Sequence, residues 1–171
     1  MLKKLLENNP EPALIIAPHE INRSHLDFLQ STFKEAVFYS QVQEDPAGLP
    51  EGRVLIIDNI GMLSRLYHYS TISYIGGGFN KSGIHNTLEA AVYGKPVIFG
   101  PHYQKFAEAT GLIAHRAAFN YTHETELIES VNALLSDPAL LETSSRNARE
   151  FVDSRTGATV QILAWIRKTF V

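Results

Sequence analysis

Short apolar runs recur along the chain, and each is bounded by turn-forming residues. The runs are rich in β-branched or aromatic residues, which is typical of short strands buried in a parallel sheet. This pattern predicts six strands, at residues 13–17, 37–39, 53–58, 71–76, 96–100 and 117–122.

The segments between these runs have the spacing of amphipathic helices. Helices are predicted at residues 22–33, 62–69, 84–93, 103–109 and 123–137, and Asp137-Pro138 ends the last of them. Residues 138–171 predict one or two further helices, with a break near Gly157. Residues 43–52 are interpreted as a surface turn.

Strands and helices alternate with short links, so we expect an α/β fold with a doubly wound parallel sheet. The chain has 171 residues, 44% of them hydrophobic, which is enough for a domain with its own core. The sequence shows neither an internal repeat nor a low-complexity linker, so a single domain over residues 1–171 is predicted. In such sheets, ligands bind beyond the carboxyl ends of the strands.

Composition narrows the classes of function. The net charge of -3 argues against a nucleic-acid-binding protein, which usually carries a basic patch. The chain has no cysteine, which excludes disulfides and thiolate metal sites. Four scattered histidines, His25, His68, His115 and His123, lack metal-ligand spacing, and surface or helix-cap roles are favoured for them. We expect no metal and no cofactor, and the absence of a nucleophile elbow leaves hydrolase chemistry unsupported.

Hydropathy bears on localisation. The N-terminal "MLKKLLENNPEP" lacks the apolar stretch of a signal peptide, and no segment approaches the ~20 apolar residues that span a bilayer. A cytoplasmic location is predicted.

The clearest candidate for chemistry is the glycine-rich stretch "YIGGGFNKSGIHNTLEAAVYGKPVIFG" at residues 74–100. Gly76-Gly77-Gly78 follows a predicted strand, and Gly83 precedes a predicted helix. Backbone N–H groups in such a turn favour an anion, and Lys81 with Ser82 adds a charge and a hydroxyl. The pattern matches neither G-x-G-x-x-G nor a P-loop. The alternative interpretation is a tight turn without a ligand.

The predicted helix at residues 84–93 carries a polar face. At ~100° per residue, His85, Asn86 and Glu89 fall on one side of it, opposite an apolar face. A carboxylate at the position of Glu89 suits hydrogen bonds from the vicinal hydroxyls of a ribose. The alternatives are an ordinary solvated face and, for His85, a helix-start residue packed under the loop.

These motifs resemble those of the 3-deoxy-D-manno-octulosonic acid (Kdo) transferases, in their C-terminal, nucleotide-sugar-binding domain. That family carries Gly-Gly-Ser, His-Asn-x-x-Glu, Gly-x-Pro-Val and Gly-Pro-His, followed by Asn or Lys and then Phe. The corresponding stretches here are residues 76–78, 85–89, 94–97 and 100–102, ending at Phe106. Residues 58–70 are similar to the family's Asp-Thr-x-Gly-Glu-Leu segment, and residues 15–20 to its Pro-Arg-His-Pro-Glu turn.

The resemblance implies a Rossmann-like domain, the C-terminal half of a B-type (double-Rossmann) inverting glycosyltransferase. Such enzymes move Kdo from CMP-Kdo to a lipid A precursor at the cytoplasmic face of the inner membrane. The resemblance implies that this chain is a fragment without its own catalytic residues. The general base, the acceptor domain and any peripheral membrane contact are then expected in a missing N-terminal domain, and the isolated chain is expected to be inactive.

The resemblance also assigns donor-binding roles to residues of this chain. They are His19, Glu20, Gly61, Met62, Gly77, Gly78, Lys81, Gly83, His85, Asn86, Glu89 and His102. In this assignment Glu89 holds the ribose, and Asn86 contacts the phosphate or sugar. Several of these residues also have an alternative role that involves no ligand. These roles are a surface turn for His19 and Glu20, core packing for Met62, and a position at the rim of the site for His102.

Three positions depart from the family pattern, and each changes one of the expected contacts. Gly78 stands for a serine, Met62 for an acidic residue, and His19 lies near an expected arginine. Two other kinds of function remain open on the sequence. One is a UDP-dependent glycosyltransferase or epimerase domain, and the other is a non-catalytic nucleotide-binding or interaction module.

Overall fold

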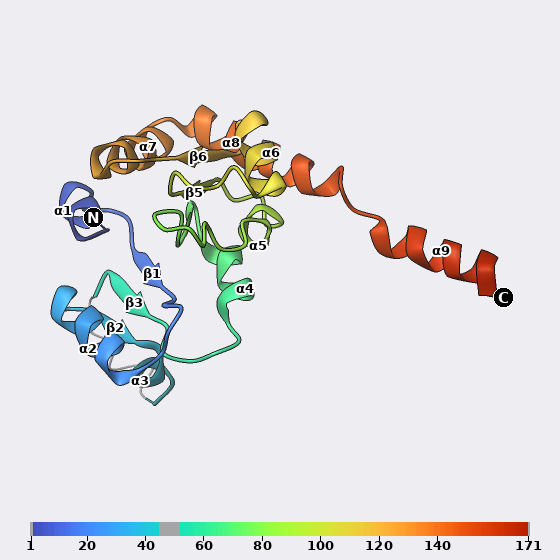
Figure 1. Cartoon of the computed structure of the whole chain (residues 1–171). Coiled ribbons are helices and arrows are strands. Elements are labelled where there is room, and N and C mark those ends of the chain that lie inside the picture. Colours follow the sequence, from blue (N-terminus) through green and yellow to red (C-terminus); the bar gives the residue numbers. More distant parts are fainter. Residues whose placement is uncertain (1, 45–51, 171) are drawn as a thin grey trace. The chain divides into compact units, whose positions relative to one another are not determined.

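The structure is a computed structural model that describes residues 2–44 and 52–170 (Figure 1). Contacts within the chain divide it into two compact units, Met1–Leu63 and Ser64–Val171. Each unit holds one three-stranded parallel sheet. Most of the surface turn predicted at residues 43–52 lies outside the described residues.

The sheet of the first unit has the strand order β1-β3-β2. Its strands are β1 (Leu14–Ile16), β2 (Val37–Phe38) and β3 (Val54–Ile56), and its helices are α1 (Leu2–Asn8), α2 (Arg23–Thr32) and α3 (Tyr39–Glu44). In the central strand, Ile56 pairs with Ile16 on one side and with Phe38 on the other. Its side chain is fully buried in a small core with Leu6 and Leu29.

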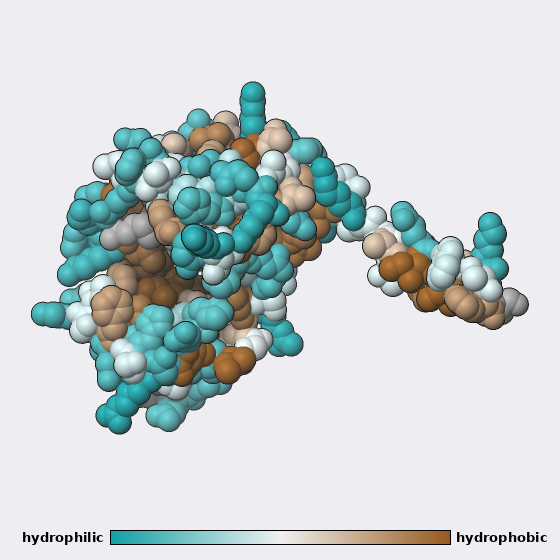
Figure 2. Space-filling view, viewed as in Figure 1, coloured by the Kyte–Doolittle hydropathy of each residue, from teal (hydrophilic) through white to brown (hydrophobic). Residues whose placement is uncertain are grey.

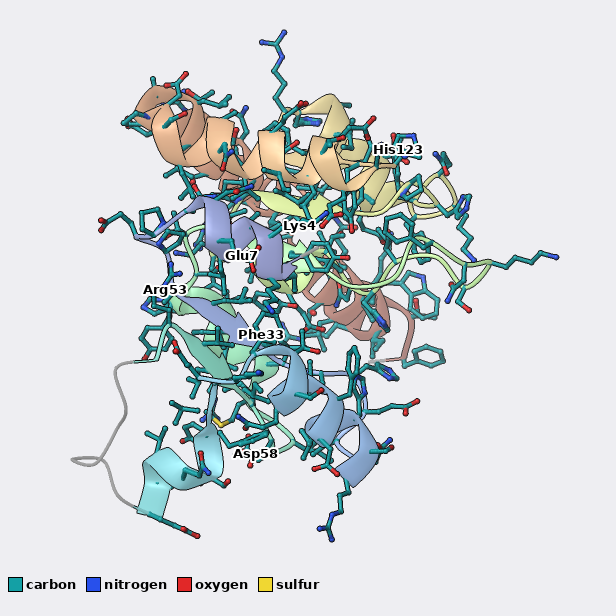
Figure 3. All side chains as sticks on the ribbon, turned by 90° about the vertical axis from the view of Figure 1, so that its left-hand side faces the viewer. Lys4, Glu7, Phe33, Arg53, Asp58 and His123 are labelled. Carbon is teal, nitrogen blue, oxygen red and sulfur yellow. The ribbon has the colours of Figure 1, made fainter. Side chains whose placement is uncertain are left out.

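Polar side chains fix the ends of two helices in this unit. Asn22 is the N-cap of α2, where its Oδ1 accepts a hydrogen bond from the backbone N–H of His25 at 2.9 Å. The guanidinium of Arg53 donates to the carbonyl oxygens of Leu6 and Asn9 at 3.1 and 2.7 Å (Figure 3). These carbonyls lie at the C-terminal end of α1, where the helix itself supplies no donor.

The sheet of the second unit has the order β4-β5-β6. Its strands are β4 (Ser73–Ile75), β5 (Val97–Phe99) and β6 (Ala118–Asn120). The helical segments are α4 (Leu63–Leu66), the 3₁₀ turn η1 (Tyr67–Tyr69), α5 (Leu88–Ala91), α6 (Ala107–Ala114), α7 (Glu124–Ser136), α8 (Pro138–Asp153) and α9 (Ala158–Phe170). All three residues of β5 are buried, because this central strand is flanked on both edges and packed on both faces.

The core of this unit gathers Phe99 from the sheet, Leu112 from α6 and Phe151 from α8, all at most 2% exposed. The start of α8 is set by Asp137, whose Oδ1 accepts from the N–H groups of Ala139 and Leu140. Pro138 at the first helical position leaves no N–H unsatisfied there. The predicted boundary at Asp137-Pro138 is therefore confirmed.

All six predicted strands are present, and their parallel pairing confirms the α/β class. Within each unit the described strands pair as a three-stranded parallel sheet, as the predicted fold class requires. Alternation of strand and helix predicts parallel pairing, but it does not specify which strands become neighbours. The predicted break near Gly157 is confirmed, because this glycine has φ +108° between α8 and α9.

Two helix predictions need correction. The helix predicted at residues 84–93 is a single turn, Leu88–Ala91, because residues before it belong to a hairpin. The helix predicted at residues 103–109 begins only at Ala107 and continues to Ala114.

Helix α9 differs from the other helices because every one of its residues is exposed. Figure 2 shows brown, hydrophobic surface along this helix. Its exposed large apolar side chains are Val160, Ile162, Leu163, Trp165, Ile166 and Phe170. Over residues 2–44 and 52–170, none of the helices is both long enough and apolar enough to cross a membrane.

Candidate functional site

Residues 76–85, here called the glycine loop, form a tight hairpin at the carboxyl end of β4. Gly77 and Ile84 form an antiparallel bridge. On either side of it, the N–H of Gly78 donates to the carbonyl of Gly83 at 2.7 Å, and the N–H of His85 donates to the carbonyl of Gly76 at 3.1 Å. The loop's own hydrogen bonds therefore define its shape.

Three glycines of this loop have backbone angles that other residues rarely adopt. Gly77, Gly78 and Gly83 have φ of +86°, +82° and +84°. A Cβ on Gly78 would lie 2.9 Å from the Cα of Gly100, and a Cβ on Gly83 would lie 2.4 Å from the ring of Phe106. The fold of the loop thus accounts for glycine at these positions, so residue identity alone does not indicate a ligand.

The residues after the loop do not share a helical face as the sequence predicted. Helix α5 begins at Leu88, while His85 and Asn86 lie in the non-helical segment before it. The helical prediction failed because Ile84 pairs with Gly77 across the hairpin, which holds residue 84 out of a helix. His85 and Glu89 are therefore not neighbours one turn apart on one helix.

Asn86 and Glu89 are nevertheless joined directly. The Oδ1 of Asn86, the residue before the N-cap Thr87, accepts from the N–H of Leu88 at 3.0 Å, which satisfies a free donor of the first turn of α5. Its Nδ2 donates to Oε1 of Glu89, also at 3.0 Å. One amide side chain thus starts the helix and orients the carboxylate.

Glu89 is half-buried and acts electrostatically on Tyr67 of the 3₁₀ turn. Burial raises the pKa of the Tyr67 hydroxyl to about 12, and the nearby Glu89 carboxylate adds to this effect. The Tyr67 hydroxyl therefore stays protonated, and hence neutral, at physiological pH.

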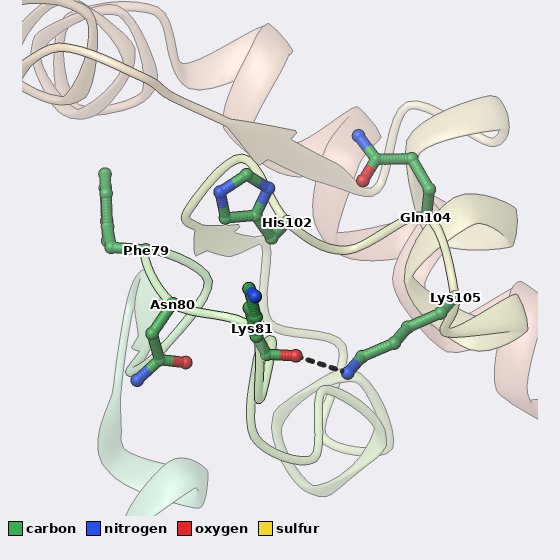
Figure 4. Close-up of a pocket in the computed structure, with 6 residues that line it drawn as sticks. All are labelled: Phe79, Asn80, Lys81, His102, Gln104 and Lys105. Carbon is green, nitrogen blue, oxygen red and sulfur yellow. Dashed lines mark hydrogen bonds between the residues drawn. The ribbon is translucent and has the colours of Figure 1, made fainter.

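A pocket of about 440 Å³ opens beside the glycine loop (Figure 4). It is lined by Phe79, Asn80, Lys81, His102, Gln104 and Lys105. The loop supplies the first three, and the segment between β5 and α6 supplies the others. The two segments are tied together, because the N–H of His102 donates to the carbonyl of Gly78 at 2.9 Å. The predicted site residues Lys81 and His102 therefore share one pocket.

Lys105 also lines this pocket, although the sequence interpretation assigned it no role. Its Nζ donates to the carbonyl of Lys81 at 2.8 Å. The position of Lys105 was a usable signal, because it lies a few residues beyond the carboxyl end of β5, where α/β proteins place ligand-binding side chains. Phe79, Asn80 and Gln104 were missed as well, and their polar or aromatic character alone did not distinguish them.

The other four predicted site residues lie in the first unit. His19 and Glu20 are exposed beyond the end of β1, and Oε2 of Glu20 accepts from Nδ2 of the cap residue Asn22 at 3.1 Å. Gly61 is exposed with φ +96°, and Met62 is half-buried. The other eight predicted residues belong to the second unit, where they lie in or around the glycine loop and the start of α5.

The remaining histidines have the surface and capping positions that the sequence favoured. His123 is the N-cap of α7 in a capping box with Glu126, and backbone N–H groups on the Glu126 carboxylate lower its pKa. Nδ1 of His115 lies 2.8 Å from the carbonyl of Gly111. The His68 ring meets Tyr69 edge-on, and His25 lies in α2. Within the described parts of the chain, no cluster of three or more His, Asp or Glu side chains has the arrangement of a metal site.

No protein family model matches the chain. Curated relatives do match it. The 3-deoxy-D-manno-octulosonic acid transferase of Rickettsia prowazekii is 32% identical over 119 residues, which is 68% of this chain and 26% of that protein. The transferase of the same name from Aquifex aeolicus is 38% identical over 87 residues, which is 50% of this chain and 25% of that protein. The chain is similar in sequence to the Kdo transferases.

Among solved structures, the C-terminal CMP-Kdo binding domain of WaaA from Acinetobacter baumannii superposes with a TM-score of 0.74. The match has 22% sequence identity and covers 88% of this chain and 79% of that one. At this identity the match shows a shared fold, that of the C-terminal domain of a B-type glycosyltransferase. The chain spans about a quarter of the length of the two Kdo transferases named above.

Proposed function

We propose that this chain is the donor-binding part of a Kdo transferase and that it holds CMP-Kdo beside the glycine loop. The observation that carries the proposal is the sequence similarity to curated Kdo transferases, which reaches over 68% of the chain in one of them. The geometry supports it, because an acidic side chain and a basic pocket flank the same loop.

In this proposal Glu89 accepts hydrogen bonds from the ribose hydroxyls of the donor. Its Oε1 already accepts from Asn86, and a carboxylate has further lone pairs on both oxygens for two hydroxyl donors. Asn86 then acts as a positioning residue for Glu89, a role that differs from the contact with the phosphate or sugar expected from the sequence.

The basic side chains of the pocket serve the charged end of the donor. When an acceptor hydroxyl attacks the anomeric carbon, the bond to the CMP phosphate breaks and negative charge develops on that phosphate. Fixed positive charges near it stabilise the transition state. In this proposal the Lys81 ammonium supplies such a charge and the His102 ring contributes a hydrogen bond, since both residues line the pocket.

The activity of the longer protein is part of the same proposal. We infer that it transfers Kdo to a lipid A precursor at the cytoplasmic face of the inner membrane. The acceptor-binding domain and the general base would then be supplied by regions beyond the donor-binding part.

The test is a titration of the 171-residue chain with CMP, UMP and UDP, followed by calorimetry and by amide chemical shifts. CMP should bind most tightly, with a dissociation constant of roughly millimolar order, about 4 kcal/mol of binding free energy. Shift changes should concentrate at residues 76–89 and 102–105. Tighter binding of UDP than of CMP, or changes spread evenly over the chain, would reject the proposal in favour of another sugar-nucleotide protein or an interaction module.

A further inference from the structure

Lys105 joins the two segments that form the pocket. Its ammonium donates to the carbonyl of Lys81 at 2.8 Å, drawn as the dashed line in Figure 4. The same ammonium lies 5.4 Å from the centre of the Phe106 ring. That ring packs on Gly83, at the other end of the loop tip. Lys105 and Phe106 thus hold the tip of the glycine loop from one side.

The pocket also concentrates basic side chains. Lys81, Lys105 and His102 are three of its six lining residues, and none of those six is acidic. An ammonium has three N–H donors, and the bond to the Lys81 carbonyl uses one of those on Lys105. The remaining donors can meet a ligand without breaking the contact that shapes the loop.

We propose that Lys105 has two linked roles, as a positioning residue for the glycine loop and as part of an anion subsite with Lys81 and His102. The subsite takes a carboxylate or a phosphate group. This inference rests on the proposed function for the identity of the ligand, because CMP-Kdo carries both groups. Because two lysines and no acidic residue are among the six residues that line the pocket, an anionic group is attracted to it and a cationic one is repelled.

Three variants separate the two roles of Lys105. Lys105→Gln removes the charge but keeps an N–H donor near the Lys81 carbonyl, and Lys105→Arg keeps the charge and a donor. The matched control is Lys95→Gln, because Lys95 precedes β5 and so lies at the opposite, amino end of the same strand. Each variant of the 171-residue chain is titrated at fixed ionic strength with CMP, cytidine and free Kdo, and amide shifts are followed.

Comparison of CMP with cytidine isolates the phosphate, and free Kdo isolates the carboxylate. Lys105→Gln should weaken binding of the anion that occupies the subsite by roughly tenfold, in line with a hydrogen bond to a charged group. Cytidine binding should change little, Lys105→Arg should restore most of the affinity, and Lys95→Gln should match the wild type. If the loss is confined to CMP the anion is the phosphate, and if it is confined to Kdo the anion is the carboxylate.

Two results would overturn the anion subsite. One is an equal loss for cytidine and CMP together with shifted amides at Gly78 and Gly83, which would leave Lys105 a structural residue of the loop. The other is unchanged binding of both CMP and Kdo by Lys105→Gln, or no binding of either anion by the wild type. Should UDP bind more tightly than CMP and still depend on Lys105, the proposed donor would be wrong while the subsite would stand.

Discussion

The amide of Asn86 bridges the first turn of α5 and the carboxylate of Glu89. Its two polar atoms act in opposite directions, with Oδ1 accepting from the N–H of Leu88 and Nδ2 donating to Oε1 of Glu89, each at 3.0 Å. Helix stability and carboxylate orientation therefore depend on one side chain. This coupling makes the His-Asn-x-x-Glu motif a structural unit as well as a candidate binding motif.

Replacement of Asn86 by alanine should destabilise the chain by about 1 kcal/mol, because loss of a capping side chain typically costs that much. Asn86→Asp keeps an acceptor for the Leu88 N–H but places a second carboxylate against Glu89. We therefore expect Asn86→Asp to retain most of the stability while weakening CMP binding. Urea unfolding and CMP titration of both variants check this. Equal stability of Asn86→Ala and the wild type would show that the cap contributes nothing.

Replacement of Glu89 by alanine should chiefly affect donor binding. The lost charge-assisted bonds to ribose are worth roughly 1.5–3 kcal/mol, a 10- to 150-fold loss of affinity. CMP and 2′-deoxy-CMP provide the internal comparison, since the wild type should prefer CMP and Glu89→Ala should lose that preference. A large fall in melting temperature with CMP affinity intact would instead identify Glu89 as a structural partner of Asn86.

The sequence predicted the strands of this chain better than the segment that carries its chemistry. The run at β5 predicts a buried strand, because Val97–Phe99 are all apolar and the run is flanked by turn-forming residues. Residues 84–87 were misassigned for a physical reason. Their apolar spacing fits a helix, yet Ile84 is held in the bridge with Gly77, so α5 starts only at Leu88.

The pocket shows a second limit of sequence interpretation. Lys81 was identified by its place in the glycine-rich stretch, and His102 by its place in the Gly-Pro-His motif of the resemblance. Lys105 was assigned no role, although it precedes Phe106 in the matched motif, because its contact with the Lys81 carbonyl joins residues 24 positions apart and involves a backbone atom. A contact of this kind can be identified only from the three-dimensional structure of the hairpin.

Tyr67 gives a prediction for alkaline pH. Its pKa is raised from 10.0 to about 12 in the folded chain, so the folded state holds the phenolic proton more tightly than the unfolded state. The resulting stabilisation is fully present below pH 10 and is lost as the pH rises from 10 towards 12. Tyr67→Phe lacks this proton, so its free energy of unfolding should fall less steeply over that range.

Burial also raises the pKa of Tyr121, so both tyrosines contribute to the loss of stability at alkaline pH. The difference in free energy of unfolding between the wild type and Tyr67→Phe gives the contribution of Tyr67 alone. Urea unfolding at several pH values supplies the measurement. Because the Glu89 carboxylate adds to the shift, Glu89→Gln should move the titration of Tyr67 to lower pH, followed by tyrosinate absorbance. Identical alkaline slopes for the wild type and Tyr67→Phe would contradict the assignment.

Gly83 gives a prediction about the glycine loop itself. Gly83→Ala places a Cβ at φ +84° and 2.4 Å from the Phe106 ring, so backbone strain and steric overlap act together. The strain costs roughly 1–2 kcal/mol and the overlap about 1–3 kcal/mol. Gly157→Ala is the matched control, since Gly157 also has positive φ but a Cβ there would meet nothing within 4 Å. Gly157→Ala should therefore cost only the strain.

A double-mutant cycle separates the two terms for Gly83. Phe106→Leu removes ring atoms that the new Cβ would meet, so Gly83→Ala should cost less in that background than in the wild type. The free energies of unfolding of the four proteins give the coupling, which should be about 1 kcal/mol or more in the direction of relief. Strictly additive effects would mean that Gly83 is required for its backbone angle alone and that Phe106 does not clamp the loop.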